Sequence, residues 1–249
     1  MTRKADHYSY AVYADAAMAR SFDDRRFGGP IGELIAGTQA SVVASMIGRI
    51  HDRRILDVGT GTGRAALVLA GERGRVTAVD ASEEMLQVAR QRAAEQGVSV
   101  TFLRGDAHDL QFDDRAFEVA VCLRVLMHAP DWRRCLGELC RVAAQLVIFD
   151  YPSATSLAAL ESAGRRLKQA ADSRTEAYRV FRTAPIEEAL RRSGFRMRSM
   201  HHQFVLPIQL HRMIGSRRFT EWSEKLLDRA GLLRRAGSPV TVCAERCES

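Results

Sequence analysis

Five short apolar runs recur through the middle of the chain, between Arg54 and Pro152. In order they read RILDVG, VTAVD, VTFLRGD, FEVAVCLR and QLVIFDYP. Each run is too continuous for a strand with one face in water, and too short for most helices. The pattern therefore predicts five strands that are buried on both faces.

Helical periodicity fills the intervals between these runs, in the segments 63–72, 82–97 and 131–142. The second segment has the clearest limits, because Ser82 can act as its N-cap and Gly97 stands just past its end. Strands that alternate with helices indicate a parallel sheet with helices on both faces.

The pattern extends to both sides of this central region. Ahead of the first strand, an apolar helical face interrupted by Gly37 predicts a leading helix, with apolar positions at Ile31, Leu34, Ile35, Val42, Val43, Met46 and Ile47. Later in the chain we expect a helix at 184–193, a long strand at 195–207, a helix at 219–231 and a last strand at 238–246. The predicted fold class is α/β: a Rossmann-like, doubly wound, mostly parallel seven-stranded sheet with helices on both faces.

The composition is that of one globular unit. With 249 residues, 46% of them hydrophobic, the chain can bury one substantial core. No run of about 18 apolar residues occurs, so no integral membrane segment is expected. The beginning, MTRKADHYSY, lacks the apolar stretch of a secretory signal, and we expect a cytoplasmic protein.

Cysteines, histidines and net charge add little chemistry to this picture. The five cysteines are odd in number and form no C-x-x-C pair, which favours reduced thiols and no metal site. His201 and His202 lie in a late strand without companion metal ligands. The net charge of +7 comes mostly from arginines that are scattered along the chain. This scatter favours arginines that are solvated on the surface, and binding of an anionic substrate is the alternative.

A strand, a glycine-rich turn and a helix at Ile55–Ala70 form a general nucleotide cradle, because glycine permits close approach and a helix N-terminus offers free N–H donors. The glycines are spaced G-x-G-x-G rather than G-x-G-x-x-G, and a P-loop lysine is absent. Asp57 stands beside this turn, where a carboxylate repels a pyrophosphate and attracts an ammonium group. The ligand that fits is S-adenosyl-L-methionine, which has no phosphate and carries a sulfonium and an amino-acid head.

From Arg53 to Asp150 the sequence resembles the class I S-adenosylmethionine-dependent methyltransferases, since several motifs occur in the family's order. The first family motif is similar to LDVGTGTG, and the third is similar to RGDAHDLQF. Between them, the acid that ends VTAVD matches the family's residue that hydrogen-bonds both ribose hydroxyls. The resemblance implies a cofactor site made by Asp57, Gly59, Thr60, Gly61, Gly63, Asp80, Ala81, Met85, Asp106, Ala107 and Arg124. In it, Ala81 and Met85 border the adenine, Asp106 accepts the adenine amino group, and the backbone of Ala107 meets a ring nitrogen.

The sequence also resembles the small-molecule branch of this family, which includes quinone-biosynthesis and natural-product enzymes. The segments that carry this resemblance are RVLMHAPD and DWRRCLGELCRV. RVAAQLVIFD departs from the Pro-Gly-Gly turn that is common there, which leaves the subfamily open. The expected reaction is methyl transfer to a small, partly apolar acceptor, with O-methylation favoured over N- or C-methylation.

Four residues are candidates for contact with that acceptor. His128, after the fourth predicted strand, suits the role of a general base for a hydroxyl, and a loop-capping role stays open. Asp150 and Tyr151 are expected to follow the fifth strand and to face the same rim as His128. With Tyr13 they are candidate substrate residues, and packing or turn chemistry is the alternative. A metal is unnecessary for methyl transfer from a sulfonium.

This interpretation divides a single domain into four parts. They are an N-terminal helical cap over the cofactor site at 1–50, the S-adenosylmethionine-binding core at 51–152, a helical lid at 153–183, and the completion of the sheet at 184–249.

Rival functions stay open. An RNA or other nucleic-acid methyltransferase is disfavoured, because the Asn/Asp-Pro-Pro-aromatic signature and a basic, aromatic platform are absent from the sequence. A non-catalytic S-adenosylmethionine-binding module stays open because motif residues report binding rather than turnover. An NAD-dependent dehydrogenase is a third possibility, and the oligomeric state is not indicated.

Overall fold

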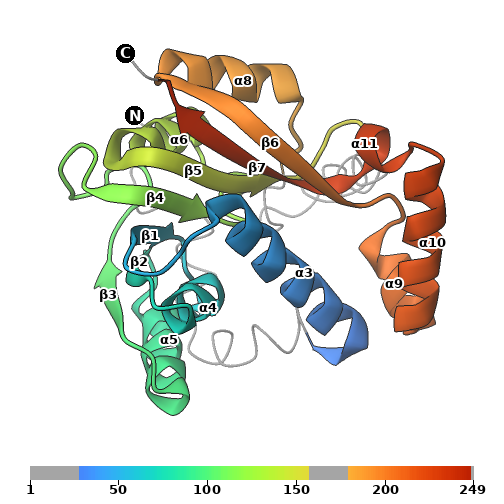
Figure 1. The fold of residues 1–249 in the computed structure, drawn as a ribbon, viewed down its shortest axis with the longest axis horizontal. Coiled ribbons are helices and arrows are strands. Elements are labelled where there is room, and N and C mark those ends of the chain that lie inside the picture. The colour runs from blue at the N-terminus through green and yellow to red at the C-terminus, as the bar shows by residue number, and fades with distance from the viewer. Residues whose placement is uncertain (1–27, 157–178, 248–249) are drawn as a thin grey trace, which may run out of the picture.

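A computed structural model describes residues 28–156 and 179–247, and Figure 1 shows helices packed around one twisted sheet. The candidate Tyr13, most of the proposed cap at 1–50 and most of the proposed lid at 153–183 lie outside the described residues.

The sheet has seven strands in the order β3-β2-β1-β4-β5-β7-β6. The strands are β1 (Arg54–Val58), β2 (Arg75–Asp80), β3 (Val100–Arg104), β4 (Phe117–Cys122), β5 (Ala143–Tyr151), β6 (Phe195–Phe204) and β7 (Ser238–Arg246). The pairs from β3 through β5 are parallel, whereas β7 runs antiparallel to both β5 and β6. The predicted mostly parallel, seven-stranded sheet is confirmed.

Side chains that alternate along the inner strands fill two separate layers of core. Ile55 and Val119 point to the face covered by α3 and α4, while Leu56 and Ala120 point to the face covered by α6 and α8. The continuous apolar runs follow from this burial on both sides. β3 is the exception, because it forms an edge of the sheet and Leu103 is 41% exposed, so the prediction that it is buried on both faces is wrong.

The helices confirm most of the predicted pattern. They are α3 (Gly29–Ile47), α4 (Arg64–Gly71), α5 (Glu83–Gln96), α6 (Trp132–Val142), α8 (Thr183–Arg192), α9 (Ile208–Ile214), α10 (Arg217–Arg229) and α11 (Leu233–Ala236). At the start of α5, the Ser82 hydroxyl accepts a hydrogen bond from the Met85 backbone, and Gly97 ends the helix with a left-handed backbone. The sequence pattern did not predict the short helices α9 and α11.

Across the two described ranges, none of the helices has both the length and the apolar character that a membrane crossing requires.

Candidate functional site

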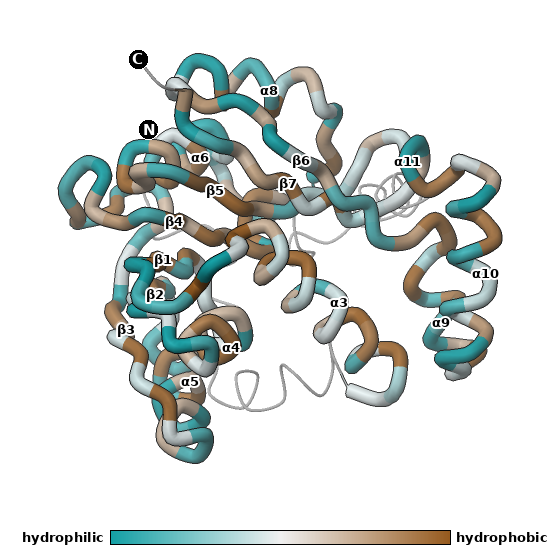
Figure 2. Tube along the Cα trace, in the orientation of Figure 1, coloured by the Kyte–Doolittle hydropathy of each residue, from teal (hydrophilic) through white to brown (hydrophobic). Residues whose placement is uncertain are grey.

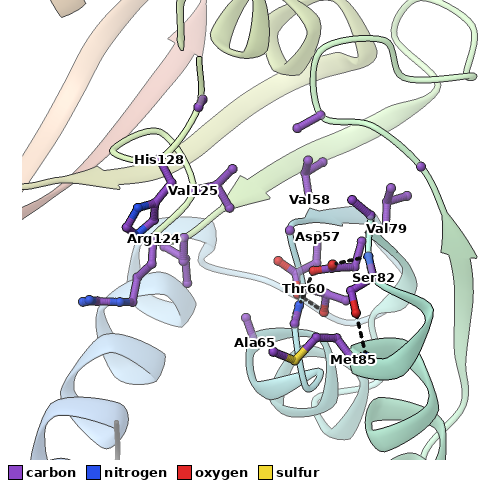
Figure 3. A pocket seen from close by; sticks show the side chains of 18 of the residues that line it. Asp57, Val58, Thr60, Ala65, Val79, Ser82, Met85, Arg124, Val125 and His128 are labelled. Carbon is purple, nitrogen blue, oxygen red and sulfur yellow. Dashed lines mark hydrogen bonds between the residues drawn. The ribbon is translucent and has the colours of Figure 1, made fainter. Parts of the chain in front are cut away.

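A pocket opens at the carboxyl ends of the parallel strands, beside the point where the strand order reverses between β1 and β4 (Figure 3). Open α/β sheets bind ligands at such switch points, because the loops after adjacent strands diverge there. The loops that follow β1, β2, β3 and β4 all contribute to its wall.

The glycine-rich turn after β1 lies in tight contact with its surroundings. Gly59 has a φ of 70°, and a Cβ atom at that position would lie 2.2 Å from the Cγ2 atom of Val125. The amides of Gly59 and Thr60 both donate to the Val79 carbonyl, at 2.8 and 3.1 Å, which holds the turn against the end of β2. At the far end of the turn, Gly63 has a φ of 85° and forms the N-cap of α4. Only glycine combines these backbone angles with so close an approach.

Asp57 lies in β1 directly before this turn and is almost fully buried. Its carboxylate accepts a hydrogen bond of 2.7 Å from the Thr60 hydroxyl. Burial raises the pKa of Asp57 to about 6, and the Thr60 hydrogen bond offsets only part of that rise. A buried carboxylate that is costly to ionise is suited to a cationic group, which would stabilise its charge.

Asp80 ends β2 and accepts two backbone hydrogen bonds, from Gly61 at 2.7 Å and from Ser82 at 2.9 Å. Burial raises its pKa, while these two amides act in the opposite direction. The carboxylate therefore ties the glycine turn to the start of α5. Two acidic side chains at the ends of neighbouring strands also make the pocket unfavourable for a phosphate.

A second group of polar side chains connects α3 to the end of β5. The amide nitrogen of Gln39 donates to Asp150 at 3.1 Å, and its oxygen accepts from Arg64 at 3.0 Å. Asp150 also accepts from the backbone amide of Arg124, a non-glycine residue with a φ of 61°. Asp150 has no exposed surface, and burial raises its pKa against the opposing charge of Arg124. It fixes the loop after β4 in an unusual backbone conformation.

That loop brings His128 into the pocket wall. His128 is 8% exposed, and its backbone amide donates to the Val125 carbonyl at 2.9 Å. In Figure 3 the side chains of His128 and Arg124 lie together on one side, apart from the group formed by Asp57, Thr60 and Met85. The pocket thus has an acidic end at β1 and β2 and a basic end at the loop after β4.

Most of the predicted cofactor residues meet in this pocket. Its wall includes Asp57, Gly59, Thr60, Gly61, Asp80, Ala81, Met85, Ala107 and Arg124, together with the candidate base His128. Gly63 stands behind the wall as the helix cap. Asp106 is also outside the wall, and its carboxylate accepts from the backbone and ring of His108, at 2.9 and 2.8 Å.

The two candidate substrate residues on β5 are placed differently from the expectation. Asp150 and Tyr151 are the last residues of the strand rather than residues beyond it, and neither lines the pocket. Tyr151 is 1% exposed, stacks edge-on against Phe181 and bonds Thr183 through its hydroxyl. A continuous apolar strand turns both side chains into the interior, so Asp150 supports the loop and Tyr151 belongs to the core.

Several other pocket residues were not anticipated from the sequence, among them Gln39, Arg64, His108 and Val125. Gln39 did carry a signal, because it stands four residues from both Ile35 and Val43 on the buried face of the leading helix. A polar residue on such a face needs a partner. Arg64 occupies the position at which a dinucleotide fingerprint would have its third glycine.

Replacing Asp150 by alanine should lower the free energy of unfolding by about 3 kcal/mol, because the Arg124 amide and the Gln39 side chain would lose a buried acceptor. Urea unfolding measures this change. Asp150→Asn is the matched control, since it keeps an acceptor oxygen and should be affected less. Equal stability of the alanine variant and the wild type would contradict the supporting role.

Comparison with known proteins shows which proteins this part of the chain resembles. Residues 55–145 match the family described as a methyltransferase domain. The chain is 35% identical over 131 residues to a ubiquinone biosynthesis O-methyltransferase from Alkalilimnicola ehrlichii, covering 52% of this chain and 53% of that protein. It is 40% identical over 106 residues to a demethylmenaquinone methyltransferase from Thermus thermophilus, covering 40% and 48%. The chain thus spans about half the length of these curated relatives.

Solved structures agree on the fold over a longer range. Magnesium protoporphyrin IX methyltransferase from Synechocystis PCC 6803, solved with bound SAH, superimposes with a TM-score of 0.69 at 18% identity, covering 97% of this chain and 100% of that one. The matched region, 55–145, holds the glycine turn, Asp57, Asp80 and the loop after β4. Residues 55–145 therefore match a methyltransferase domain, and the chain as a whole shares the fold of that solved methyltransferase.

Proposed function

We propose that this protein is an S-adenosylmethionine-dependent methyltransferase that acts on a small, partly apolar acceptor, with a hydroxyl as the favoured site of methylation. The observation that carries the proposal is that two buried carboxylates, Asp57 and Asp80, hold a glycine turn at the switch point of the sheet. One relative is named for ubiquinone biosynthesis and the other for demethylmenaquinone, which supports a small-molecule acceptor of partly apolar character.

The residues of the pocket suit each part of this cofactor. The carboxylate of Asp80 would accept the ribose hydroxyls while it holds the Gly61 and Ser82 amides. Asp57 would meet the ammonium of the amino-acid head, and the turn has no space for side chains at Gly59. Apolar Met85 and the small Ala81 and Ala107 would border the adenine. When bound, the cofactor supplies an electrophilic methyl group on a sulfonium.

The protein's own contribution to the reaction is then positioning, exclusion of water and removal of a proton. The loop after β4 presents His128 and Val125 to the pocket, and Asp150 holds that loop through the Arg124 amide. In an in-line displacement, most of the rate gain comes from aligning the acceptor with the methyl group. A hydroxyl acceptor must also lose its proton, and we assign that role to His128.

Calorimetric titration with S-adenosylhomocysteine tests the cofactor assignment. We expect saturable binding, while NADH should give no heat. The absence of heat at about 1 mM ligand would overturn the proposal, since affinity would then be weaker than about −4 kcal/mol. A labelled-methyl screen of small phenols, acids and amines beside bulk RNA tests the acceptor class. Binding without transfer to any acceptor in a cell extract would favour a non-catalytic module.

The affinity for S-adenosylhomocysteine should fall as the pH is lowered through about 6. The reason is that the pKa of Asp57 lies at about 6 in the free protein, and only the ionised carboxylate attracts an ammonium group. At pH 5 roughly a tenth of the Asp57 side chains are ionised, so the Kd should rise about tenfold relative to pH 7. Titrations from pH 5 to 8 measure this slope. An Asp57→Asn variant should bind weakly with a flatter profile, and an equally steep profile in that variant would contradict the assignment.

A further inference from the structure

We propose that α10 is a docking surface for an anionic lipid bilayer, and that the protein attaches to such a bilayer from one side without crossing it. Figure 1 places α9, α10 and α11 together at the end of the molecule opposite β3 and α5. The proposal concerns this end and does not depend on methyl transfer.

Exposed apolar side chains gather at this end of the molecule. Among the described residues the three most exposed large apolar side chains are Met213 at 82%, Trp222 at 64% and Leu226 at 52%. Ile214 and Leu232, at 43% and 40%, belong to the same region of the chain. In Figure 2, α9 and α10 both alternate between hydrophobic and hydrophilic segments along the chain. A large, exposed tryptophan beside an exposed leucine indicates a surface that is covered in use.

The exposed residues of α10 are arranged in rows along the helix. Trp222 and Leu226 are separated by four residues and so share one side. Arg218, Lys225 and Arg229 form an adjoining row at the helical spacings of seven and four. All five side chains are exposed, and within the described residues no ion pair involves the three basic ones. We call these five residues the α10 face.

The two exposed acidic residues of α10 lie beside the basic row, on the side away from Trp222 and Leu226. Glu221 pairs with Arg217 at 2.7 Å, and Asp228 stands seven residues further along the same side. An apolar row beside a basic row is the arrangement of helices that lie in a membrane interface, where the apolar side chains enter the lipid and the cations meet the headgroups. Tryptophan prefers this interface as well.

The opposite side of α10 holds the helix firmly in place. Glu224 accepts hydrogen bonds from the Val205 and Leu206 amides, at 2.8 and 3.0 Å, and contacts the buried ring of His211 at 2.9 Å. The hydroxyl of Thr220 contacts the other ring nitrogen of His211 at 3.0 Å. Because these contacts set the rotation of α10, the α10 face is presented outward as a rigid surface.

Charge favours a lipid surface over a second copy of the chain. The segment 208–236 contains seven Lys or Arg residues against three Asp or Glu residues, one of which is the buried Glu224. In a symmetric dimer through this face, the two basic rows would meet and repel. An anionic bilayer supplies the complementary charge and a place for Trp222 at once.

The docked surface is connected to the pocket through α3. This helix packs against α9 and α10, and it supplies Gln39 to the pocket wall.

Sedimentation with vesicles tests the proposal on the full chain. We expect binding to phosphatidylcholine vesicles that contain phosphatidylserine, and at least about tenfold weaker binding to phosphatidylcholine alone. The paired variants Lys225→Glu with Arg229→Glu, and Trp222→Ala with Leu226→Ala, should each weaken binding by at least about tenfold. Matched controls at other exposed sites are Arg49→Glu with Arg75→Glu, and Val68→Ala with Leu103→Ala, which should bind like the wild type.

Tryptophan fluorescence gives a second measurement, which detects insertion into the bilayer directly and does not rely on a variant that binds more weakly. Of the two tryptophans, Trp132 is 6% exposed and Trp222 is 64% exposed, so insertion should shift the emission of Trp222 to the blue and allow quenching by lipids brominated in their acyl chains. Trp222→Phe should keep vesicle binding and lose both signals. Circular dichroism confirms that each variant is folded.

Several results would overturn the proposal. They are no binding of the wild type to anionic vesicles, equal binding to both kinds of vesicle, or equal losses in the control variants. Self-association that requires Trp222 and Leu226 in the absence of lipid would instead identify a second copy as the occupant.

Discussion

Replacing Asp80 by alanine is expected to weaken the binding of S-adenosylhomocysteine by about 2–3 kcal/mol, or roughly 30- to 150-fold in Kd. Two charge-assisted hydrogen bonds to the ribose would be lost. The amides of Gly61 and Ser82, which the carboxylate now accepts, would no longer hold the turn and the start of α5 in place. Calorimetry on the folded variant measures the change.

Asp80→Asn separates ligand binding from folding. Burial raises the pKa of Asp80, which means that its negative charge is costly in the folded protein. The amide removes that charge and keeps one acceptor oxygen, but it leaves one of the two backbone N–H donors without an acceptor. The free energy of unfolding at pH 7 should therefore fall by no more than about 1–2 kcal/mol, while affinity also falls. Glu95→Ala, on the exposed side of α5, is the matched control and should bind normally. Unchanged affinity in Asp80→Ala would assign the carboxylate to the turn alone.

Replacing His128 by alanine should lower the single-turnover rate on a hydroxyl acceptor by roughly 100-fold or more, with little change in affinity for S-adenosylhomocysteine. The imidazole lies in the pocket wall apart from Asp57 and Thr60, so its loss should spare the contacts proposed for the cofactor (Figure 3). Rapid-quench measurement with an identified acceptor gives the chemical rate without the contribution of product release.

The exposed His51 offers a control, because His51→Ala should leave the rate and the affinity unchanged. A His128→Ala enzyme that keeps near-wild-type rates would remove this residue from the chemistry. Such a result would point to an acceptor that is already nucleophilic, a carboxylate or a neutral amine, for which alignment alone suffices. A purely structural histidine would show itself instead as a lower unfolding temperature with an unchanged rate.

The sheet and the acidic end of the pocket were predictable because they depend on short stretches of chain. A buried parallel strand needs a continuous apolar run, and a close turn needs glycines at left-handed positions, as at Gly59 and Gly63. Asp57 and Asp80 stand near the ends of such runs. Because β1 and β2 pair in parallel, both residues were expected at the carboxyl ends of the strands. The cap and lid, and with them Tyr13, stay predictions.

The local pattern could not assign side chains at the ends of strands to the pocket or to the interior. Asp150 and Tyr151 were expected at the rim, but β5 continues through both, and the packing of β7 and Phe181 encloses them. The partner of Asp150 is Gln39, 111 residues away in the sequence. The sequence pattern of neither segment predicts this hydrogen bond, because it depends on where α3 lies against the sheet.

The sequence by itself determined the order of the strands and of the longer helices, the glycine turn and the two acids at the acidic end of the pocket, since apolar periodicity and turn geometry depend on neighbouring residues. Only the tertiary structure decided which polar groups are buried together, such as Asp150 with Gln39 and the Arg124 amide. It also decided that Trp222 and Leu226 face outward beside a basic row, while Glu224 on the same helix turns inward to His211. The physical reason is that burial of a side chain depends on all the elements packed around it, which no single stretch of sequence contains.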